Sequence, residues 1–223
     1  MPRADAGTAA AVDPEPPRGC PLCPRLVAYR AENRAAHPDW WNGPAPSFGD
    51  PNAQLLVVGL APGRTGANRT GRPFTGDFAG VLLYETLIKT GFARGSYAAR
   101  PDDGLALVDC MITNAVRCAP PGNKPETSEE AGCRPFLAAR IAALPRLKVI
   151  VTLGDVARRN VLRALGLKAS ASAGGHGARC EAAGYSLINS YHCSRLNTNT
   201  GRLTPAMFEA VFEAAKAELA RSG

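Results

Sequence analysis

The sequence predicts an α/β protein in which a parallel, doubly wound sheet is covered by helices on both faces. From Leu55 onward, short apolar runs alternate with patterns typical of amphipathic helices, which is how βαβ units read in a sequence. A chain of 223 residues that is 45% hydrophobic can bury one substantial core. Polar and reactive residues follow the ends of the apolar runs, where ligands bind in such folds.

The N-terminal part carries little that could enter this core. Residues 1–18 contain four prolines and few apolar side chains, so we expect a disordered tail there and a single domain over residues 19–223. A helix is predicted over residues 25–36. Residues 37–52 are rich in Pro, Gly and Trp and are expected to pack as irregular structure.

Four strand and helix pairs make up the rest of the chain. The strands are expected at residues 55–59, 109–116, 149–153 and 187–190, and the helices at residues 78–89, 128–143, 154–165 and 205–219. Two of the helices have recognisable starts. Thr127-Ser128 is a candidate cap for the second, and Thr204-Pro205 places a capping residue before a proline at the first position of the last.

Charge and hydropathy limit the possible partners. The formal net charge of +7 favours a polyanionic partner, although it could equally serve solubility. No apolar run approaches the roughly 20 residues of a membrane span. The N-terminus has no apolar stretch of the kind found in a secretory signal, so we expect a cytoplasmic protein.

A glycine-rich loop follows the first predicted strand. It contains Gly59 and Gly63, three arginines, Phe74 and a closing carboxylate, Asp77. Glycines let backbone N–H groups approach a negatively charged ligand closely. The loop matches neither GxGxxG nor a GK[ST] phosphate loop. The simpler interpretation is a long surface loop.

The cysteines suggest a metal site. Cys20 and Cys23 form a CxxC, and Cys118 and Cys133 flank a Pro-rich loop. Four thiolates suit either tetrahedral zinc or an iron–sulfur cluster. The alternative is that these cysteines are small buried side chains.

A polar, cationic loop begins at His192, at the end of the last predicted strand. Within it, Leu196 suits an apolar wedge that enters a base stack, or it folds back onto the core. A different class of function would use Cys193 or Ser194 as a nucleophile with His192 as the base.

Together these motifs resemble the uracil-DNA glycosylase superfamily, most closely its iron–sulfur branch called family 5 or type b. The resemblance rests on Gly59-Leu-Ala-Pro-Gly63, Gly-Arg-Pro-Phe74-Thr-Gly-Asp77, Thr-Asn114-Ala-Val-Arg-Cys118, the four cysteines and the His192 loop. It runs from about Cys20 to the C-terminal helix. It implies a three-layer α/β/α sandwich with a central four-stranded parallel sheet, a 4Fe–4S cluster on Cys20, Cys23, Cys118 and Cys133, and excision of uracil and related damaged bases from double-stranded DNA.

The resemblance also implies roles for individual residues. Phe74 would stack on the extruded base, Asn114 would bond its Watson–Crick edge, and Asp77 and His192 would be catalytic. The base pocket would also include Gly59, Ala61 and Gly63. The loop from Ser194 to Thr200, with Asn197, would penetrate the helix with Leu196 as the wedge. Candidate phosphate contacts are Arg64, Arg69, Arg72, Lys124, Arg195 and Arg202, and the alternative for each of them is a solvated surface charge.

This chain departs from other branches of the superfamily at three positions. Leu60 and Ala61 are apolar where better-known glycosylases carry an acid, so catalysis would shift to Asp77 or to backbone dipoles. Gly63 stands where uracil-specific enzymes have a guarding aromatic, which implies a broader substrate range. Cys193 replaces a common proline after the histidine.

Three further expectations concern the reaction and its rivals. No lysine stands at a motif position suited to a Schiff base, so we expect a monofunctional enzyme that leaves an abasic site, acting as a monomer. One rival is a non-catalytic, cysteine-rich zinc module that binds DNA. The other is a hydrolase of small nucleotides or esters.

Overall fold

The protein is described over residues 12–221 in a computed structural model. The helices are α1 (Pro24–Ala36), α2 (Ala67–Thr70), α3 (Phe78–Thr90), α4 (Thr127–Ala142), α5 (Asp155–Ala164), α6 (Arg195–Asn199) and α7 (Pro205–Arg221), with 3-10 turns at Pro121–Asn123 and Ala169–Ala171. The strands are β1 (Phe48–Gly49), β2 (Leu55–Gly59), β3 (Ala93–Arg94), β4 (Ala106–Leu107), β5 (Cys110–Asn114), β6 (Val149–Leu153), β7 (Arg179–Ala182) and β8 (Tyr185–Ser190).

One mixed sheet runs through the centre of the molecule in the order β1-β5-β2-β6-β8-β7. Its four central strands are parallel to one another, which confirms the predicted central sheet. The structure adds an antiparallel strand at each edge, β1 against β5 and β7 against β8. These short edge strands carry no long apolar run, so the sequence did not predict them.

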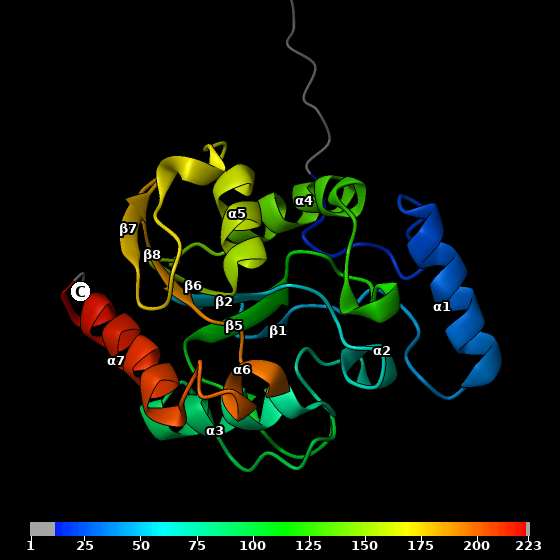
Figure 1. Cartoon of the computed structure of the whole chain (residues 1–223), viewed down its shortest axis with the longest axis horizontal. Coiled ribbons are helices and arrows are strands. Elements are labelled where there is room, and N and C mark those ends of the chain that lie inside the picture. Colours follow the sequence, from blue (N-terminus) through cyan, green and yellow to red (C-terminus); the bar gives the residue numbers. More distant parts are fainter. Residues whose placement is uncertain (1–11, 222–223) are drawn as a thin grey trace, which may run out of the picture.

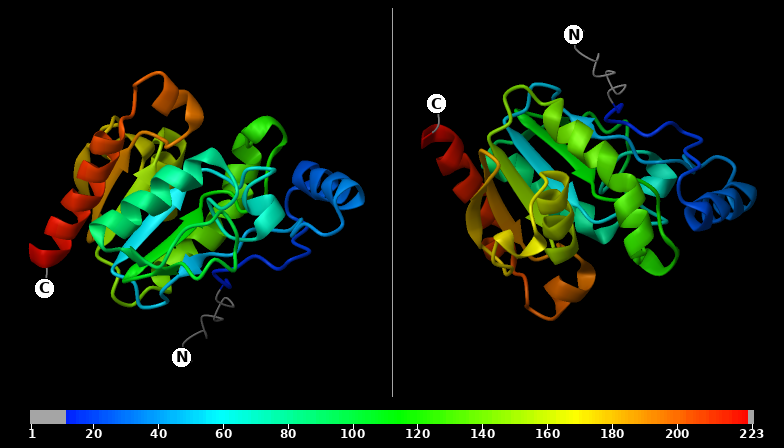
Figure 2. Two further views of the ribbon diagram at one scale, coloured as in Figure 1. Left: turned by 90° about the horizontal axis from the view of Figure 1, so that it is seen from below. Right: turned by 90° about the horizontal axis from the view of Figure 1, so that it is seen from above.

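Helices cover both faces of this sheet, as predicted. Figure 1 shows α4 and α5 on one face and α3 and α7 on the other, and Figure 2 shows the same layers from two further directions. The side chains of β2 alternate between the two cores: Leu55 and Val57 pack on the α3 and α7 side, and Leu56 and Val58 on the other. A strand buried on both faces needs such an unbroken apolar run, and this is why the run after Gln54 was readable as a strand.

Helix starts follow the expected chemistry, with one shift. Thr204 caps α7, since its Oγ1 accepts a hydrogen bond from the Met207 N–H at 3.2 Å. Helix α4 begins at Thr127, one residue earlier than predicted, and its N-cap is Glu126. The N–H of Glu126 donates to Glu129 Oε2 at 2.7 Å. The carboxylate at the third helical position therefore provides part of the capping that was predicted for Thr127-Ser128.

The segment before the domain differs from the prediction. Glu15 forms ion pairs with Arg117 and Arg140 and accepts a hydrogen bond from the Ser47 N–H at 3.0 Å. The Arg117 side chain is only 1% exposed, so this carboxylate neutralises a buried cation. The expectation of a disordered tail is therefore wrong for residues 12–18. Residues 1–11 lie outside the described part of the chain.

Helix α1 lies apart from the layers that enclose the sheet (Figures 1 and 2). Its Leu26 joins a third, small apolar cluster with Val116, Cys118, Cys133 and Phe136. Over residues 12–221, none of the helices combines the length and the apolar character that crossing a membrane requires.

Candidate active site

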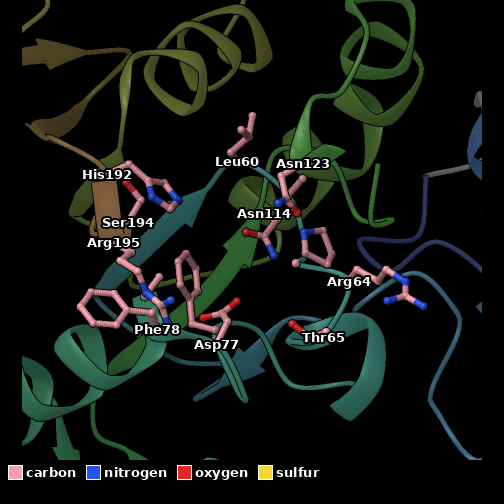
Figure 3. Close-up of a pocket in the computed structure, with 15 residues that line it drawn as sticks. Leu60, Arg64, Thr65, Asp77, Phe78, Asn114, Asn123, His192, Ser194 and Arg195 are labelled. Atoms are coloured by element: carbon pink, nitrogen blue, oxygen red, sulfur yellow. The ribbon is translucent and has the colours of Figure 1, made fainter. Parts of the chain in front are cut away.

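A cavity of about 420 Å³ opens where β2, β5 and β8 end. Figure 3 shows the residues that line it, which come from loops distant in sequence, with Asp77, Asn114 and His192 pointing toward the same space. The predicted residues that line it are Ala61, Gly63, Arg64, Phe74, Asp77, Asn114, His192, Ser194 and Arg195. The parallel sheet therefore brings the four side chains proposed to contact the base or to act in catalysis into one site: Phe74, Asp77, Asn114 and His192.

Phe74 is held in an unusual backbone conformation at this site. Its φ is +53°, in the left-handed region that a bulky residue rarely adopts. The Tyr97 hydroxyl donates to its carbonyl at 3.1 Å, and a Cβ at Gly80 would collide with that carbonyl. Gly59 leaves space for the ring, because a Cβ there would lie 2.5 Å from Phe74 Cζ. The two glycines thus allow the ring its place in the cavity.

Asn114, the last residue of β5, faces Gly59 across the β2–β5 pair. Its side chain is almost completely buried, with 2% exposure, and its Oδ1 has no hydrogen-bond partner within residues 12–221. A buried polar atom left unpaired costs about 1–3 kcal/mol. A ligand that donates to this oxygen would remove that cost.

Asp77 is the N-cap of α3, and its Oδ1 accepts a hydrogen bond from the Gly80 N–H at 3.1 Å. Burial raises the pKa of this carboxyl, an effect that the backbone hydrogen bonds from Gly80 and Ala79 partly oppose. Its Oδ2 faces the glycine-rich loop. A Cβ at Gly63 would lie 3.0 Å from that oxygen, and one at Gly66 would collide with it. Glycines at these positions therefore give the carboxylate its space.

His192 follows β8, and burial lowers the pKa of its imidazole. The ring is neutral at neutral pH as a result. Its Nδ1 is buried without a hydrogen-bond partner in the described chain, and its ring centre lies 6.2 Å from that of Phe74. The backbone of His192 is fixed through its carbonyl, which accepts a hydrogen bond from Asn197 Nδ2 at 2.8 Å.

The loop after His192 forms the short helix α6, which the sequence did not predict. Ser194 is its N-cap and accepts a hydrogen bond from the Asn197 N–H. Leu196 projects outward with 72% of its surface exposed, so the alternative in which it folds onto the core is wrong. Asn197 orders the loop through its bond to His192, and Arg195 lines the cavity mouth.

The predicted phosphate contacts divide into separate groups. Arg64 lines the cavity and donates from Nε to Asn33 Oδ1 at 2.7 Å. Lys124 is exposed and directly follows Asn123, which lines the same cavity. Arg69 instead borders another cavity, beside Trp40 and Trp41. Arg202 lies with its guanidinium 4.5 Å from the Tyr191 ring centre, at a neighbouring cavity that shares Leu60 and His192 with the first.

Arg72 corrects the prediction, because its side chain is not available to a phosphate. It is 5% exposed and makes two hydrogen bonds to the Asp103 carboxylate, at 2.8 and 2.7 Å. This pairing holds the pKa of Asp103 well below its usual range. Arg72 is thus a structural cation under the loop that carries Phe74 and Thr75, and its Nε donates to Thr75 Oγ1 at 2.7 Å.

The four cysteines of the predicted metal site line one small cavity between α1, the loop after β5 and α4. None is in a disulfide, and the Arg117 N–H donates to Cys133 Sγ at 3.3 Å. Within residues 12–221, no three Cys, His, Asp or Glu side chains are placed to hold a single metal ion. The four sulfurs border the same cavity, so a group that reaches several of them could be held there. Four soft thiol ligands are the donor set of iron–sulfur clusters.

Burial raises the pKa of Cys118 to about 12 and that of Cys133 to about 11. Thiolates at these positions would need a compensating positive charge, which a metal centre provides. Cys193 differs from them. It is completely buried and burial raises its thiol pKa, and it does not line the cavity with His192. The interpretation of Cys193 as a nucleophile is wrong.

Six residues that line the cavity were not predicted as site residues: Leu60, Pro62, Thr65, Phe78, Ala79 and Asn123. Asn123 could have been found, since it is a polar residue in the loop that follows a central strand. Phe78 could not, because an apolar residue in the first turn of a helix normally indicates the core.

Comparison with known proteins agrees with this geometry. Residues 46–216 match the family model described as the uracil DNA glycosylase superfamily. A protein named Type-5 uracil-DNA glycosylase from Thermus thermophilus is 46% identical over 203 residues, which cover 88% of this chain and 92% of that protein. One of the same name from Pyrobaculum aerophilum is 42% identical, over 89% of this chain and 88% of its own.

More distant relatives include a Type-4 uracil-DNA glycosylase from Pyrobaculum aerophilum, 31% identical over 68% of this chain and 64% of that protein. The match thus extends over most of the fold and includes the strands and loops that form the cavity. The chain belongs to the uracil-DNA glycosylase superfamily.

Proposed function

We propose that this protein is a monofunctional DNA glycosylase that extrudes uracil and related deaminated or damaged bases from duplex DNA and leaves an abasic site. The observation that carries the proposal is the cavity in which Phe74, Asp77, Asn114 and His192 meet. Two of these side chains present buried polar atoms that have no partner among the residues the structure describes, Asn114 Oδ1 and His192 Nδ1. Such atoms are what a site built for a hydrogen-bonding ligand contains before the ligand arrives.

The base would be recognised by a ring and an amide. Stacking on the Phe74 ring gives affinity for any planar base. Asn114 carries one acceptor and one donor group on a single amide, which matches the paired donor and acceptor atoms of the Watson–Crick edge of uracil. A base with the opposite pattern would leave the buried Oδ1 unpaired, and this mismatch would select against it.

Glycosidic bond cleavage separates charge, and the site has groups for both parts. The sugar becomes oxocarbenium-like, and the Asp77 carboxylate would stabilise that positive charge and orient water. The departing base accumulates negative charge at O2, to which the neutral His192 would donate a hydrogen bond. Loss of one such donor typically lowers the rate about 100- to 1000-fold.

Extrusion of the base would depend on α6. Taking a base out of the stack costs a few kcal/mol, and the exposed Leu196 would fill the vacated space. Arg64 and Arg195 line the cavity, and Lys124 follows the lining residue Asn123. These three would bind phosphates, with Arg69 and Arg202 at other cavities. The cavity lining contains no lysine among the described residues, which supports a monofunctional reaction without a Schiff base.

The range of bases would be broad. Gly63 lines the cavity without a side chain, so a substituent at C5 of a pyrimidine meets no bulk from this position. We therefore expect hydroxymethyluracil to be excised as well as uracil, and we expect hypoxanthine to be excised because its N1–H and O6 offer Asn114 the same donor and acceptor pair.

Cys20, Cys23, Cys118 and Cys133 would hold a 4Fe–4S cluster. When bound, the cluster would link three parts of the chain covalently: the N-terminal arm, the loop after β5 and α4. The protein's own groups support this site through the Arg117 N–H on Cys133 and the Glu15 carboxylate on Arg117. The cluster predicts a brown protein that contains iron and acid-labile sulfide, and Cys118→Ser is expected to lose both.

The activity is tested on end-labelled duplexes that carry uracil, hypoxanthine or hydroxymethyluracil. We expect strand breaks only after alkali treatment, and a rate at least 100-fold lower for Asp77→Asn. Breaks without alkali would contradict the monofunctional assignment, and turnover of free nucleotides would instead support a hydrolase. A colourless zinc protein that binds DNA without excision would support the zinc module. The expectation of a cytoplasmic monomer stays a prediction.

A further inference from the structure

Phe78 stands out among the aromatic residues because it is exposed beside the cavity. It is the first residue of α3, directly after Asp77, and 38% of its surface is accessible. The chain contains seven phenylalanines, and the other six are buried or half-buried. Packing of the sandwich therefore does not explain the ring at this position. Figure 3 shows Phe78 next to Arg195 at one side of the cavity.

The two side chains make a cation–π contact at one side of the cavity. The Arg195 guanidinium carbon lies 5.2 Å from the centre of the Phe78 ring, within the range of an attractive contact. A guanidinium that contacts a ring in this way can still donate from its N–H groups. In the structure of residues 12–221, Arg195 has this contact and no side-chain hydrogen bond or ion pair to an acidic residue.

Arg195 is also fixed relative to the reacting groups. It begins α6, whose Asn197 side chain bonds the carbonyl of His192, and it immediately precedes the exposed Leu196. A phosphate that binds Arg195 would thus lie beside the nucleotide that enters the cavity. An arginine has many rotamers, and holding it in one of them before DNA arrives reduces the entropy lost on binding.

We propose that Phe78 is a positioning residue that holds the Arg195 guanidinium ready for a DNA phosphate beside the extruded nucleotide. The inference rests on the proposed glycosylase function and adds to it one specific phosphate contact and the residue that prepares it. Phe78 acts through Arg195, so it affects the affinity for DNA and not the cleavage of the glycosidic bond.

The test is a double-mutant cycle with Phe78→Leu, Arg195→Gln and the double variant. The Kd of each is measured by fluorescence anisotropy on a duplex with a tetrahydrofuran abasic analogue, over a series of salt concentrations. Phe78→Leu keeps an apolar side chain and is expected to weaken binding about threefold to tenfold. Arg195→Gln should lower the slope of log Kd against log salt by about 0.9. The double variant should bind no more weakly than Arg195→Gln alone.

Two further variants separate positioning from general damage to the fold. Phe78→Tyr retains the ring and should restore the wild-type Kd and salt slope. Val81 lies one turn along α3 and is similarly exposed, at 42%, so Val81→Ala should leave the Kd unchanged.

The rate of uracil excision at saturating enzyme is measured in the same set. It should stay within about twofold of wild type for Phe78→Leu. Additive losses of affinity in the double variant would overturn the proposal, as would an unchanged Kd for Phe78→Leu or a slower rate at saturation with an unchanged Kd. Failure of the glycosylase assignment would appear separately, as a wild-type protein that excises no uracil.

Discussion

Gly59 is the position at which the smallest change should do the most damage to the site. In Gly59→Ala, the new Cβ would lie 2.5 Å from both Asn114 Oδ1 and Phe74 Cζ. Ordinary contacts are about 3.5 Å, so the amide and the ring must each retreat by about 1 Å. A misplacement of that size costs about 100-fold in rate, which corresponds to roughly 2.7 kcal/mol of transition-state stabilisation.

The assay is single-turnover excision of uracil at saturating enzyme, because this isolates the chemical step from DNA binding. Gly19→Ala is the matched control, since a Cβ at Gly19 meets no atom within 4 Å, and it should react like wild type. Thermal unfolding of both variants checks that the fold survives, with about 1–3 kcal/mol of overpacking cost expected at Gly59. A Gly59→Ala enzyme that keeps its rate within threefold of wild type would refute the placement of Asn114 and Phe74 in the base site.

Three other perturbations test separate parts of the structure. Burial raises the pKa of Asp77, and catalysis requires the ionised carboxylate. The single-turnover rate should therefore fall as the pH decreases, with a midpoint above the ordinary pKa of aspartate. A rate that stays constant down to that ordinary pKa would contradict the role of Asp77. Leu196→Ala should leave the unfolding free energy unchanged because the side chain is 72% exposed. Excision should slow by roughly 10- to 100-fold, since about 1.5–3 kcal/mol of burial in the base stack is lost. A loss of unfolding free energy of the same size would mean that Leu196 packs on the core. Glu15→Gln leaves the buried Arg117 without its carboxylate and should lower the free energy of unfolding in urea by about 3 kcal/mol. The control Glu32→Gln, at an exposed residue, should change that free energy little. Similar urea midpoints for the two variants would show that the N-terminal segment contributes nothing to stability.

The central sheet was predictable because of how its strands are buried. β2, β5, β6 and β8 are almost entirely buried, and a strand covered on both faces shows its whole length as an apolar run. β1 and β7 pair on one side only and are short or partly exposed. Their sequences carry no such signal, so the mixed character of the sheet emerges only from the pairing itself.

The site was predictable to the extent that it depends on strand ends. Asn114 ends one parallel strand and His192 comes after another, and this topology places them at one edge of the sheet. Arg72 shows the limit of that reasoning. A loop arginine next to glycines reads as a phosphate ligand, but its partner Asp103 is 31 residues away, and nothing local in the sequence predicts the pair. The exposure of Phe78 and the contact of Glu15 with Arg117 likewise depend on residues that are distant in the sequence.

Helix α1 connects the cysteine cavity to the mouth of the base cavity. It begins directly after Cys23, and near its other end Asn33 accepts a hydrogen bond from Arg64 while His37 lies 3.1 Å from the same guanidinium. The helix stands outside the layers of the sandwich (Figure 1), and its first turns are held beside the cysteines by the burial of Leu26 and the ion pair of Arg25 with Glu129. Damage to the cysteine site is therefore expected to displace α1 and, with it, Arg64. Binding to the DNA backbone would then weaken while the sheet and its catalytic groups remain folded.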